Sequence, residues 1–210
     1  MQKIIEVKDL SFSYKDKKIF ENISFYIENK SVNFLIGKNG SGKTTLLKIL
    51  FFDKKKYFKT EDVQFVWEFQ NMYEELSLIK NLEIYFKLNC KKNISFKEEL
   101  QNILKYWDLE LYLMKPIKSL SYGYRQKALI TRSIIVKPDV LIVDEPFLGL
   151  DYMSYKSFIK IIKDYKDITF LISTQNPNVI RDFLEKINNN INESLNFNIN
   201  QDLTIFSFIY

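Results

Sequence analysis

The chain has 210 residues, 46% of them hydrophobic and 27% charged, which fits one compact domain with a buried core and excludes a disordered tail. Its single cysteine, Cys90, rules out an internal disulfide and suits a reducing compartment. The net charge of +5 comes from scattered lysines, a pattern that favours a solvated surface over a nucleic-acid patch.

The N-terminal part of the chain is expected to be mainly β-structure. Residues 3–7 alternate between polar and apolar side chains, and residues 32–36 are mostly apolar, as in a short buried strand. The three lysines at positions 54–56 are expected in a solvated loop. The expected strands span residues 3–7, 23–27, 32–36 and 63–67, and the expected helix spans residues 44–50.

The middle of the chain changes to helical spacing. Apolar residues between positions 78 and 86 recur at the interval of one helix face. Ser95 and Glu98 have the form of a capping box, which predicts the start of a second helix. Residues 78–115 are therefore expected to form a mostly helical lobe inserted in an α/β core.

The last third of the chain alternates between helices and short apolar strands. A helix is expected over residues 122–136, and Pro138 stops it. Because both following strands are short and apolar, they suit the centre of a parallel sheet. The expected strands span residues 140–143 and 168–172, with a crossover helix at residues 152–165 and a terminal hairpin at residues 195–199 and 204–209.

A phosphate-binding loop is indicated by residues 37–44, whose sequence GKNGSGKT matches G-x-x-x-x-G-K-[ST] between a strand and a helix. The glycines let backbone N–H groups converge on phosphate oxygens, and the helix N-terminus adds about half a positive charge. Lys43 would reach the β- and γ-phosphates, and the Thr44 hydroxyl would bind Mg²⁺. The alternative is a glycine-rich turn that happens to contain lysine, which the flanking elements disfavour. The candidate nucleotide-binding residues are Gly37, Asn39, Gly40, Ser41, Gly42, Lys43, Thr44 and Thr45.

Two carboxylates, Asp144 and Glu145, follow the apolar strand at residues 140–143. Because side chains alternate along a strand, the two cannot do the same work. Asp144 suits the second-sphere Mg²⁺ position opposite Thr44, and Glu145 can polarise a water in line with the γ-phosphate. The alternative is an acidic surface pair that caps the next element. With a phosphate loop upstream, hydrolysis is the better interpretation.

The segment Leu120–Lys127, with the sequence LSYGYRQK, resembles the signature of ATP-binding cassette (ABC) ATPases, usually Leu-Ser-Gly-Gly-Gln. Ser121 can cap the helix that follows, so that its hydroxyl and the helix N-terminus present a positive pole. The resemblance implies that Ser121 and Gly123 face the γ-phosphate held by a second subunit, so that ATP is sandwiched between two chains.

The resemblance covers about residues 3 to 185 and extends to three further positions. It implies that Tyr14 stacks on adenine, that Gln70 contacts Mg²⁺ and the attacking water, and that Asp151 crosses the dimer interface. Tyr14 could equally be plain sheet surface, and Gln70 could be an ordinary loop amide. Together with the elements above, the resemblance predicts an α/β fold: a P-loop NTPase core with a parallel sheet flanked by helices, an N-terminal antiparallel β subdomain and an inserted helical subdomain. The whole chain, residues 1–210, is expected to be one domain, with its core at residues 1–77 and 116–210 and its lobe at residues 78–115.

Three departures from the family pattern stand out. Tyr122 and Tyr124 replace the first glycine and the glutamine of the signature. The segment between Lys43 and Gln70 is short, which predicts that a β-hairpin near residues 54–60 is trimmed. Gln175 stands where the family has its switch histidine, and it can donate a neutral hydrogen bond to the γ-phosphate but cannot carry a proton.

The function that this resemblance implies is ATP hydrolysis that powers solute transport through a separate membrane-spanning permease, with ATP and Mg²⁺ as cofactors. A second ABC ATPase subunit, identical or different, is the other expected partner, and no nucleic acid is expected. Since the chain has no apolar run of spanning length and no leader, we expect it in the cytoplasm, peripheral on the inner face of a membrane. The compact length and the stretch Glu145-Pro146-Phe147 look similar to exporter-type ATPases, which predicts export. The alternatives are a soluble ABC ATPase outside transport and a weakly hydrolysing regulatory subunit.

Overall fold

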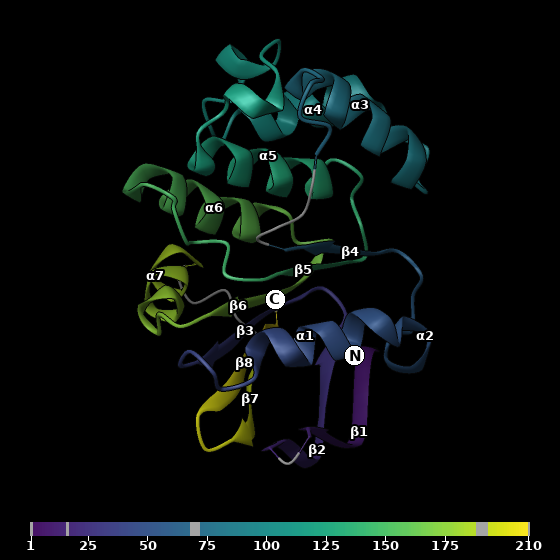
Figure 1. Ribbon diagram of the computed structural model, residues 1–210, viewed down its shortest axis with the longest axis vertical. Coiled ribbons are helices and arrows are strands. Elements are labelled where there is room, and N and C mark those ends of the chain that lie inside the picture. The colour runs from purple at the N-terminus through teal and green to yellow at the C-terminus, as the bar shows by residue number, and fades with distance from the viewer. Residues whose placement is uncertain (1, 16, 68–71, 188–192, 210) are drawn as a thin grey trace.

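The computed structural model describes residues 2–15, 17–67, 72–187 and 193–209, and Figure 1 shows its elements. The strands are β1 (Lys3–Tyr14), β2 (Lys17–Glu28), β3 (Ser31–Gly37), β4 (Val63–Val66), β5 (Val140–Val143), β6 (Thr169–Thr174), β7 (Glu193–Asn200) and β8 (Leu203–Ile209). The helices are α1 (Lys43–Phe52), α2 (Lys54–Tyr57), α3 (Leu78–Asn89), α4 (Phe96–Leu104), α5 (Tyr122–Ile134), α6 (Tyr152–Asp164) and α7 (Asn178–Ile187), with short 3-10 helices η1 (Glu110–Tyr112) and η2 (Ile117–Ser119).

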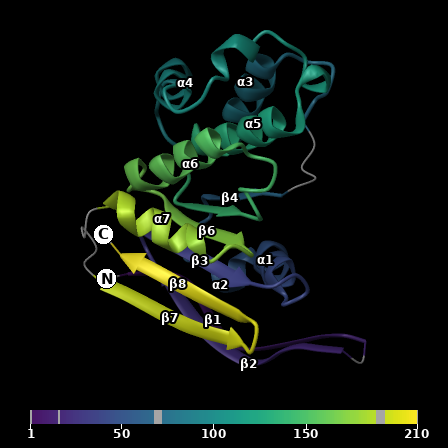
Figure 2. The ribbon, with the colours of Figure 1, turned by 90° about the vertical axis from the view of Figure 1, so that its left-hand side faces the viewer.

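The main sheet has six strands in the order β4-β5-β6-β3-β8-β7, and β1 and β2 form a separate antiparallel pair. Strands β3 to β6 run parallel, as expected of an α/β core, whereas β8 pairs antiparallel with β3 and β7 antiparallel with β8. The α/β prediction is confirmed, but the sheet is mixed rather than purely parallel. The sheet is mixed because a tight turn joins β7 to β8, and so short a connection permits only antiparallel pairing. Figure 2 shows this hairpin at one edge of the sheet.

Two hydrophobic cores lie on opposite faces of the main sheet. Phe34 and Phe170 belong to the core beneath α5, α6 and α7, whereas Leu35 and Leu171, their neighbours along β3 and β6, belong to the core with α1, β1 and β2. This alternation follows from the two-residue repeat of a strand. The helical lobe is joined to the first core through Trp107, which stacks on Phe158 at 6.3 Å between ring centroids. Figure 1 accordingly shows α1 and α5 on opposite sides of the sheet.

Most expected elements are present, and the differences are local. The terminal hairpin is confirmed as β7 and β8. The lysines at positions 54–56, expected in a solvated loop, lie instead in the short helix α2. Lys54 is half-buried, its Nζ lies 4.8 Å from the centroid of the Phe51 ring, and burial lowers its pKa. Helix α7 was not among the expected elements.

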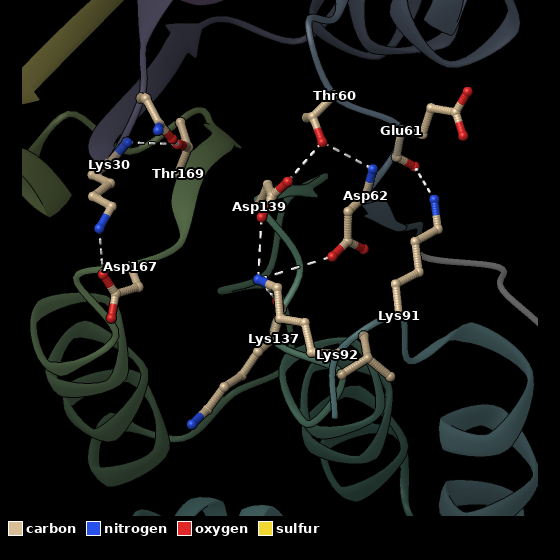
Figure 3. Close-up of polar contacts among 12 residues, drawn as sticks. Lys30, Thr60, Glu61, Asp62, Lys91, Lys92, Lys137, Asp139, Asp167 and Thr169 are labelled. Carbon is tan, nitrogen blue, oxygen red and sulfur yellow. Dashed lines mark hydrogen bonds and ion pairs between the residues drawn. The ribbon is translucent and has the colours of Figure 1, made fainter. Parts of the chain in front are cut away.

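A charged cluster lies at the amino edge of the parallel strands, and Figure 3 shows its contacts. Lys92 Nζ lies 3.1 Å from Asp139 Oδ1 and 3.9 Å from Asp62 Oδ2. Thr60 Oγ1 donates a hydrogen bond of 2.6 Å to Asp139 Oδ2. Asp62 is only 6% exposed, and among the described residues neither of its carboxylate oxygens accepts a hydrogen bond. Burial, reinforced by the charge of Asp139, raises the pKa of Asp62.

None of the helices in the described part of the chain combines the length and the apolar character that a membrane crossing requires.

Candidate functional site

The phosphate loop connects the end of β3 to the start of α1. Gly40 and Gly42 have φ values of 81° and 105°, in the left-handed region that favours glycine. Gly42 is the N-cap of α1 and has no side chain to satisfy the first amides of that helix. A Cβ atom at Gly42 would stand 3.0 Å from the side chains of Ile19 and Phe20. The loop therefore presents open backbone amides at a helix N-terminus, which is an anion-binding arrangement.

Lys43 joins this loop to the carboxylate of Glu145. Its Nζ donates hydrogen bonds to the carbonyl oxygens of Gly37 at 2.7 Å and of Lys38 at 3.3 Å, and it lies 3.1 Å from Glu145 Oε1. The Lys43 side chain is 6% exposed and that of Glu145 is 25% exposed. Glu145 also has a φ of 44°, a strained value for a residue with a side chain. Such strain is concentrated at functional sites in proteins.

Thr44, Asp144 and Ser173 form a polar chain beside this pair. Thr44 Oγ1 donates to Asp144 Oδ2 at 2.9 Å, and Ser173 Oγ donates to Asp144 Oδ1. Ser173 Oγ in turn accepts a hydrogen bond of 2.9 Å from the backbone N–H of Glu145. A hydroxyl beside a buried carboxylate is a donor set of hard oxygens, which is the set that Mg²⁺ prefers. These residues therefore fit the predicted Mg²⁺ site.

The sheet topology explains why residues so distant in sequence meet. Strand β6 lies between β3 and β5, so the carboxyl ends of all three strands open at one edge. Because Val143 pairs with Ile172, the residues that follow them, Asp144 and Ser173, lie side by side. Gln175 follows the last residue of β6 at the same edge and is exposed. Ser173 had no role assigned from the sequence, although a polar residue ending an apolar strand was the available signal.

The expected adenine-binding residue, Tyr14, lies beside α1, the helix that begins at the phosphate loop. Tyr14 is 52% exposed at the end of β1, with its ring 4.9 Å from that of Phe12. Tyr14 and Thr45 line one cavity of about 450 Å³ together with Lys48. The structure thus brings two of the predicted nucleotide-binding residues to one surface hollow.

A second group of predicted residues lies at the starts of α5 and α6. Ser121 is the N-cap of α5 and accepts from the backbone N–H of Tyr124 at 3.5 Å. A Cβ atom at Gly123 would meet the carbonyl oxygen of Gly149 at 2.9 Å, which shows how closely the two segments pack. Asp151 is the N-cap of α6 and accepts from the backbone N–H of Ser154 at 2.8 Å. These bonds from Ser154 lower the pKa of Asp151.

The two groups lie on different faces of the sheet. The phosphate loop opens α1 on one face, whereas Ser121, Gly123 and Asp151 belong to the side of α5 and α6 (Figure 1). The remaining candidate, Gln70, lies outside the described residues. One chain therefore carries two candidate half-sites, one at the phosphate loop and one at the exposed N-termini of α5 and α6.

The C-terminal hairpin contributes a residue that the sequence did not reveal. Asn200 Nδ2 donates a hydrogen bond of 3.0 Å to the carbonyl oxygen of Ser41, and Asn200 Oδ1 accepts from Asp202 N at 2.9 Å. A Cβ atom at Gly37 would lie 2.6 Å from the carbonyl oxygen of Asp202. The hairpin turn thus supports the phosphate loop, and Gly37 is small because the turn occupies the space beside it.

Comparisons with known proteins agree with this geometry. A family model described as "ABC transporter" matches residues 20–148. The zinc uptake system ATP-binding protein ZurA of Listeria monocytogenes is 30% identical, with 89% of this chain and 82% of the relative covered. The zinc import ATP-binding protein ZnuC of Ehrlichia canis is 35% identical, with 84% and 72% covered. A solved structure of an ATP-binding subunit of an ABC transporter has 27% identity and a TM-score of 0.71, with 81% of this chain and 79% of that chain covered.

One expectation needs correction in the light of these relatives. The compact length and the Glu145-Pro146-Phe147 stretch predicted export, but both relatives are named for uptake or import. The export prediction has no support and conflicts with those names. Its basis was weak in physical terms, because direction depends on the membrane-spanning partner and not on the residues that bind nucleotide.

Proposed function

This chain belongs to the ABC transporter family of ATP-binding proteins, and from that premise we propose that two such subunits close on ATP and that hydrolysis drives transport through a separate permease. One observation carries the proposal: Lys43, Thr44, Asp144 and Glu145 converge at one edge of the sheet. That edge is where nucleotides bind in open α/β sheets. We also propose the division into a core at residues 1–77 and 116–210 and a lobe at residues 78–115.

Binding of ATP uses the loop and the exposed aromatic of β1. The backbone amides at the start of α1 bind the phosphate oxygens, and Lys43 neutralises the β- and γ-phosphates. Thr45 and Tyr14 hold the nucleoside end, with the Tyr14 ring stacked on adenine. The cavity shared by Tyr14 and Thr45 supports this assignment. The glycine positions 37, 40 and 42 keep the loop close to the phosphates, with Asn39 and Ser41 between them.

The residues proposed for Mg²⁺ and for the attacking water lie beside the phosphate loop. Thr44 and Asp144 would hold Mg²⁺, with Gln70 as a further ligand, and the ion would neutralise charge on the β- and γ-oxygens. Glu145 orients the water and accepts its proton. Ser173 fixes the backbone of Glu145 through its N–H, and Lys43 lies 3.1 Å from the Glu145 carboxylate. Gln175 donates a neutral hydrogen bond to the γ-phosphate.

The second half-site comes from the opposing subunit. Ser121 and Gly123 present the N-terminus of α5 to the γ-phosphate, and Asp151 crosses to the partner. Large apolar side chains are exposed around these positions, which favours burial against another chain. The exposed apolar residues near the starts of α5 and α6 are Tyr122, Leu148, Tyr152 and Met153.

The permease is proposed to dock on the helical lobe. A cavity of about 320 Å³ is lined by residues of α3, by Arg132 of α5 and by Tyr73. Tyr73 is 60% exposed, and Leu88 is exposed on the same cavity wall. Tyr85 also lines this cavity, and both Tyr85 and Phe86 are half-buried against the hydrophobic core. The proposed docking surface therefore centres on the exposed side chains of Tyr73 and Leu88.

The test compares ATP hydrolysis and self-association of the wild type with two variants. Glu145→Gln is expected to lose at least about a hundredfold in hydrolysis rate and to accumulate as an ATP-bound dimer. Lys43→Ala is expected to lose ATP binding. Glu75→Gln serves as the matched control, because Glu75 is an exposed glutamate that pairs with Lys118 on the surface. Retained hydrolysis in Glu145→Gln, or no ATP-driven dimer, contradicts the proposal.

For the direction of transport we infer import, with a transition-metal ion as the first substrate class to test. The names of the zinc uptake and zinc import relatives support this inference. The measurement is accumulation of labelled Zn²⁺ in cells that produce this chain with its permease. Accumulation is expected to fall to background in Glu145→Gln, and export of the label would contradict the inference.

A further inference from the structure

Tyr124, one of the two unusual tyrosines of the signature, belongs to a chain of polar contacts at the start of α5, which we call the relay and which comprises Asp108, Tyr124, Lys127 and Asp151. Tyr124 OH donates a hydrogen bond to Asp108 Oδ2, and Lys127 Nζ lies 2.8 Å from Asp108 Oδ1. Tyr124 and Lys127 are three residues apart on one helix, so their side chains share a face. The Lys127 ammonium also lies 4.5 Å from the centroid of the Tyr124 ring. One carboxylate from the helical lobe thus binds two residues of the signature helix.

The relay continues to the start of α6. Lys127 Nζ lies 3.9 Å from Asp151 Oδ2, and Asp151 is held by Ser154 through both carboxylate oxygens, each at 2.8 Å. The Lys127 side chain is 6% exposed, whereas that of Asp151 is 67% exposed. A buried lysine therefore sits between an anchored carboxylate of the lobe and a carboxylate that faces outward.

The burial of Lys127 matters because burial changes how much an ion pair contributes to stability. An exposed pair contributes little, but removing one partner from a buried charge leaves that charge uncompensated. Burial would by itself raise the pKa of Asp108, yet the hydrogen bonds from Lys127 and Tyr124 outweigh it and lower that pKa. The Asp108 carboxylate is therefore ionised, and each of its oxygens bonds to one residue of α5.

We propose that Asp108 and Lys127 are positioning residues that fix the start of α5 and the start of α6 relative to each other, so that Ser121 and Asp151 meet a second chain together. This inference rests on the proposed function, because it assigns the relay to the half-site that the opposing ATP would touch. Tyr124 takes part through its hydroxyl, which gives the departure from the usual signature glutamine a structural role.

The experiment uses the full chain carrying Glu145→Gln, with ATP and Mg²⁺, and measures dimer formation by sedimentation. Asp108→Asn, Lys127→Met and Tyr124→Phe are each expected to weaken dimer formation about tenfold or more. The affinity of the single chain for ATP is expected to stay unchanged, because Lys43 and its loop are untouched. Hydrogen exchange of the backbone at residues 148–154 is expected to rise in the same variants.

A matched control lies at the other end of α6. Tyr106 OH donates a hydrogen bond of 2.9 Å to Asp164 Oδ2, so Tyr106→Phe removes a bond of the same chemistry away from Ser121 and Asp151. This variant is expected to dimerise like the parent and to leave exchange at residues 148–154 unchanged.

The outcomes separate the two proposals. Relay variants that dimerise like the Glu145→Gln parent overturn the relay and leave the proposed function standing. Relay variants that lose ATP binding as well overturn the positioning role, because the residues would then support the fold in general. A Glu145→Gln parent that stays monomeric with ATP overturns the proposed function and the relay with it, whatever the variants do.

Discussion

Gln175 stands where the family resemblance implies a histidine. It follows β6 at the edge where Glu145 and Asp144 lie, and it can donate a hydrogen bond without carrying charge. We therefore expect it to keep contact with the γ-phosphate while slowing hydrolysis. A charged donor at this position would stabilise the transition state more strongly than a neutral one.

The prediction is that Gln175→His raises the ATPase rate of the assembled complex by about tenfold, since single stabilising donors in such sites are worth that much or more. Steady-state and burst measurements check it. Gln101→His is the control, because Gln101 is exposed on α4. An unchanged or lower rate in Gln175→His would show that the glutamine is not what limits turnover.

Asp62 offers a prediction about stability. Its carboxylate is buried beside Asp139, and burial raises its pKa. Since the folded pKa is above the unfolded one, the charged carboxylate destabilises the fold at pH values above the folded pKa, and the cost fades as pH falls toward the usual carboxyl range. Asp62→Asn is therefore expected to raise the free energy of unfolding by about 1 kcal/mol at pH 7.

Chemical denaturation at pH 7 and at mildly acidic pH measures this effect. The advantage of Asp62→Asn should shrink at the lower pH, because protonation removes the same charge in the wild type. Asp167→Asn is the control of opposite sign: a hydrogen bond from Lys30 lowers the pKa of Asp167, and that side chain is exposed. A loss of stability in Asp62→Asn would mean that its contact with Lys92 outweighs desolvation.

Functional residues that belong to a short sequence motif could be predicted from the sequence, whereas Ser173 and Asp108 could not. The phosphate loop and the Asp144–Glu145 pair carry short motifs. Ser173, by contrast, acquires its contacts from the register of β5 against β6. Asp108 depends on how the lobe folds back on α5. No spacing along the chain encodes either relation.

At the scale of elements, the strands and helices with strong periodicity were predictable. Strand β5 was predicted with its observed bounds, and the terminal hairpin within a few residues. Helix α7 was missed even though Val179 and Phe183 have helical spacing and are buried. Helix α2 has only four residues, too few to show any periodicity, and a charged run favours a loop.

The contact between the signature and the start of α6 gives an element-scale prediction. Gly149 has a φ of 76°, and a Cβ atom there would stand 2.4 Å from the Tyr122 ring. Gly149→Ala is expected to cost about 1–3 kcal/mol of stability and to weaken ATP-driven dimerisation. Thermal unfolding and sedimentation measure both effects.

Adding Tyr122→Ala to Gly149→Ala separates the two causes. Removal of the ring relieves the clash but leaves the left-handed backbone strain, so the double variant should recover only part of the loss. Full recovery of stability would mean that the left-handed backbone at position 149 carries no strain. No loss of stability in Gly149→Ala would mean that the segment around residue 149 moves freely.

At the scale of the whole molecule, the α/β class followed from the alternation of strands and helices, but the mixed sheet did not. Strand β8 pairs with β3 across a long sequence separation, and such pairing leaves no local signature. The same fact explains why the support of the phosphate loop by Asn200 was missed.

Asn200 therefore provides a test of long-range support. Asn200→Ala is expected to weaken ATP binding several-fold, because it removes one neutral hydrogen bond to the phosphate loop, while the fold remains intact. Nucleotide titration checks it, with Asn198→Ala as the control, because Asn198 Oδ1 accepts a hydrogen bond from Thr204 within the hairpin. Equal affinities in the two variants would show that the turn does not support the loop.

The place of β3 in the sheet has a consequence for how the chain is made. Its neighbours are β6 and β8, so the strand that carries the phosphate loop is synthesised before both of its partners. Pairings so distant in sequence form slowly. A ribosome-bound chain that has not yet released residues 203–209 therefore lacks the β8 partner of that strand and the paired hairpin whose Asn200 supports the phosphate loop.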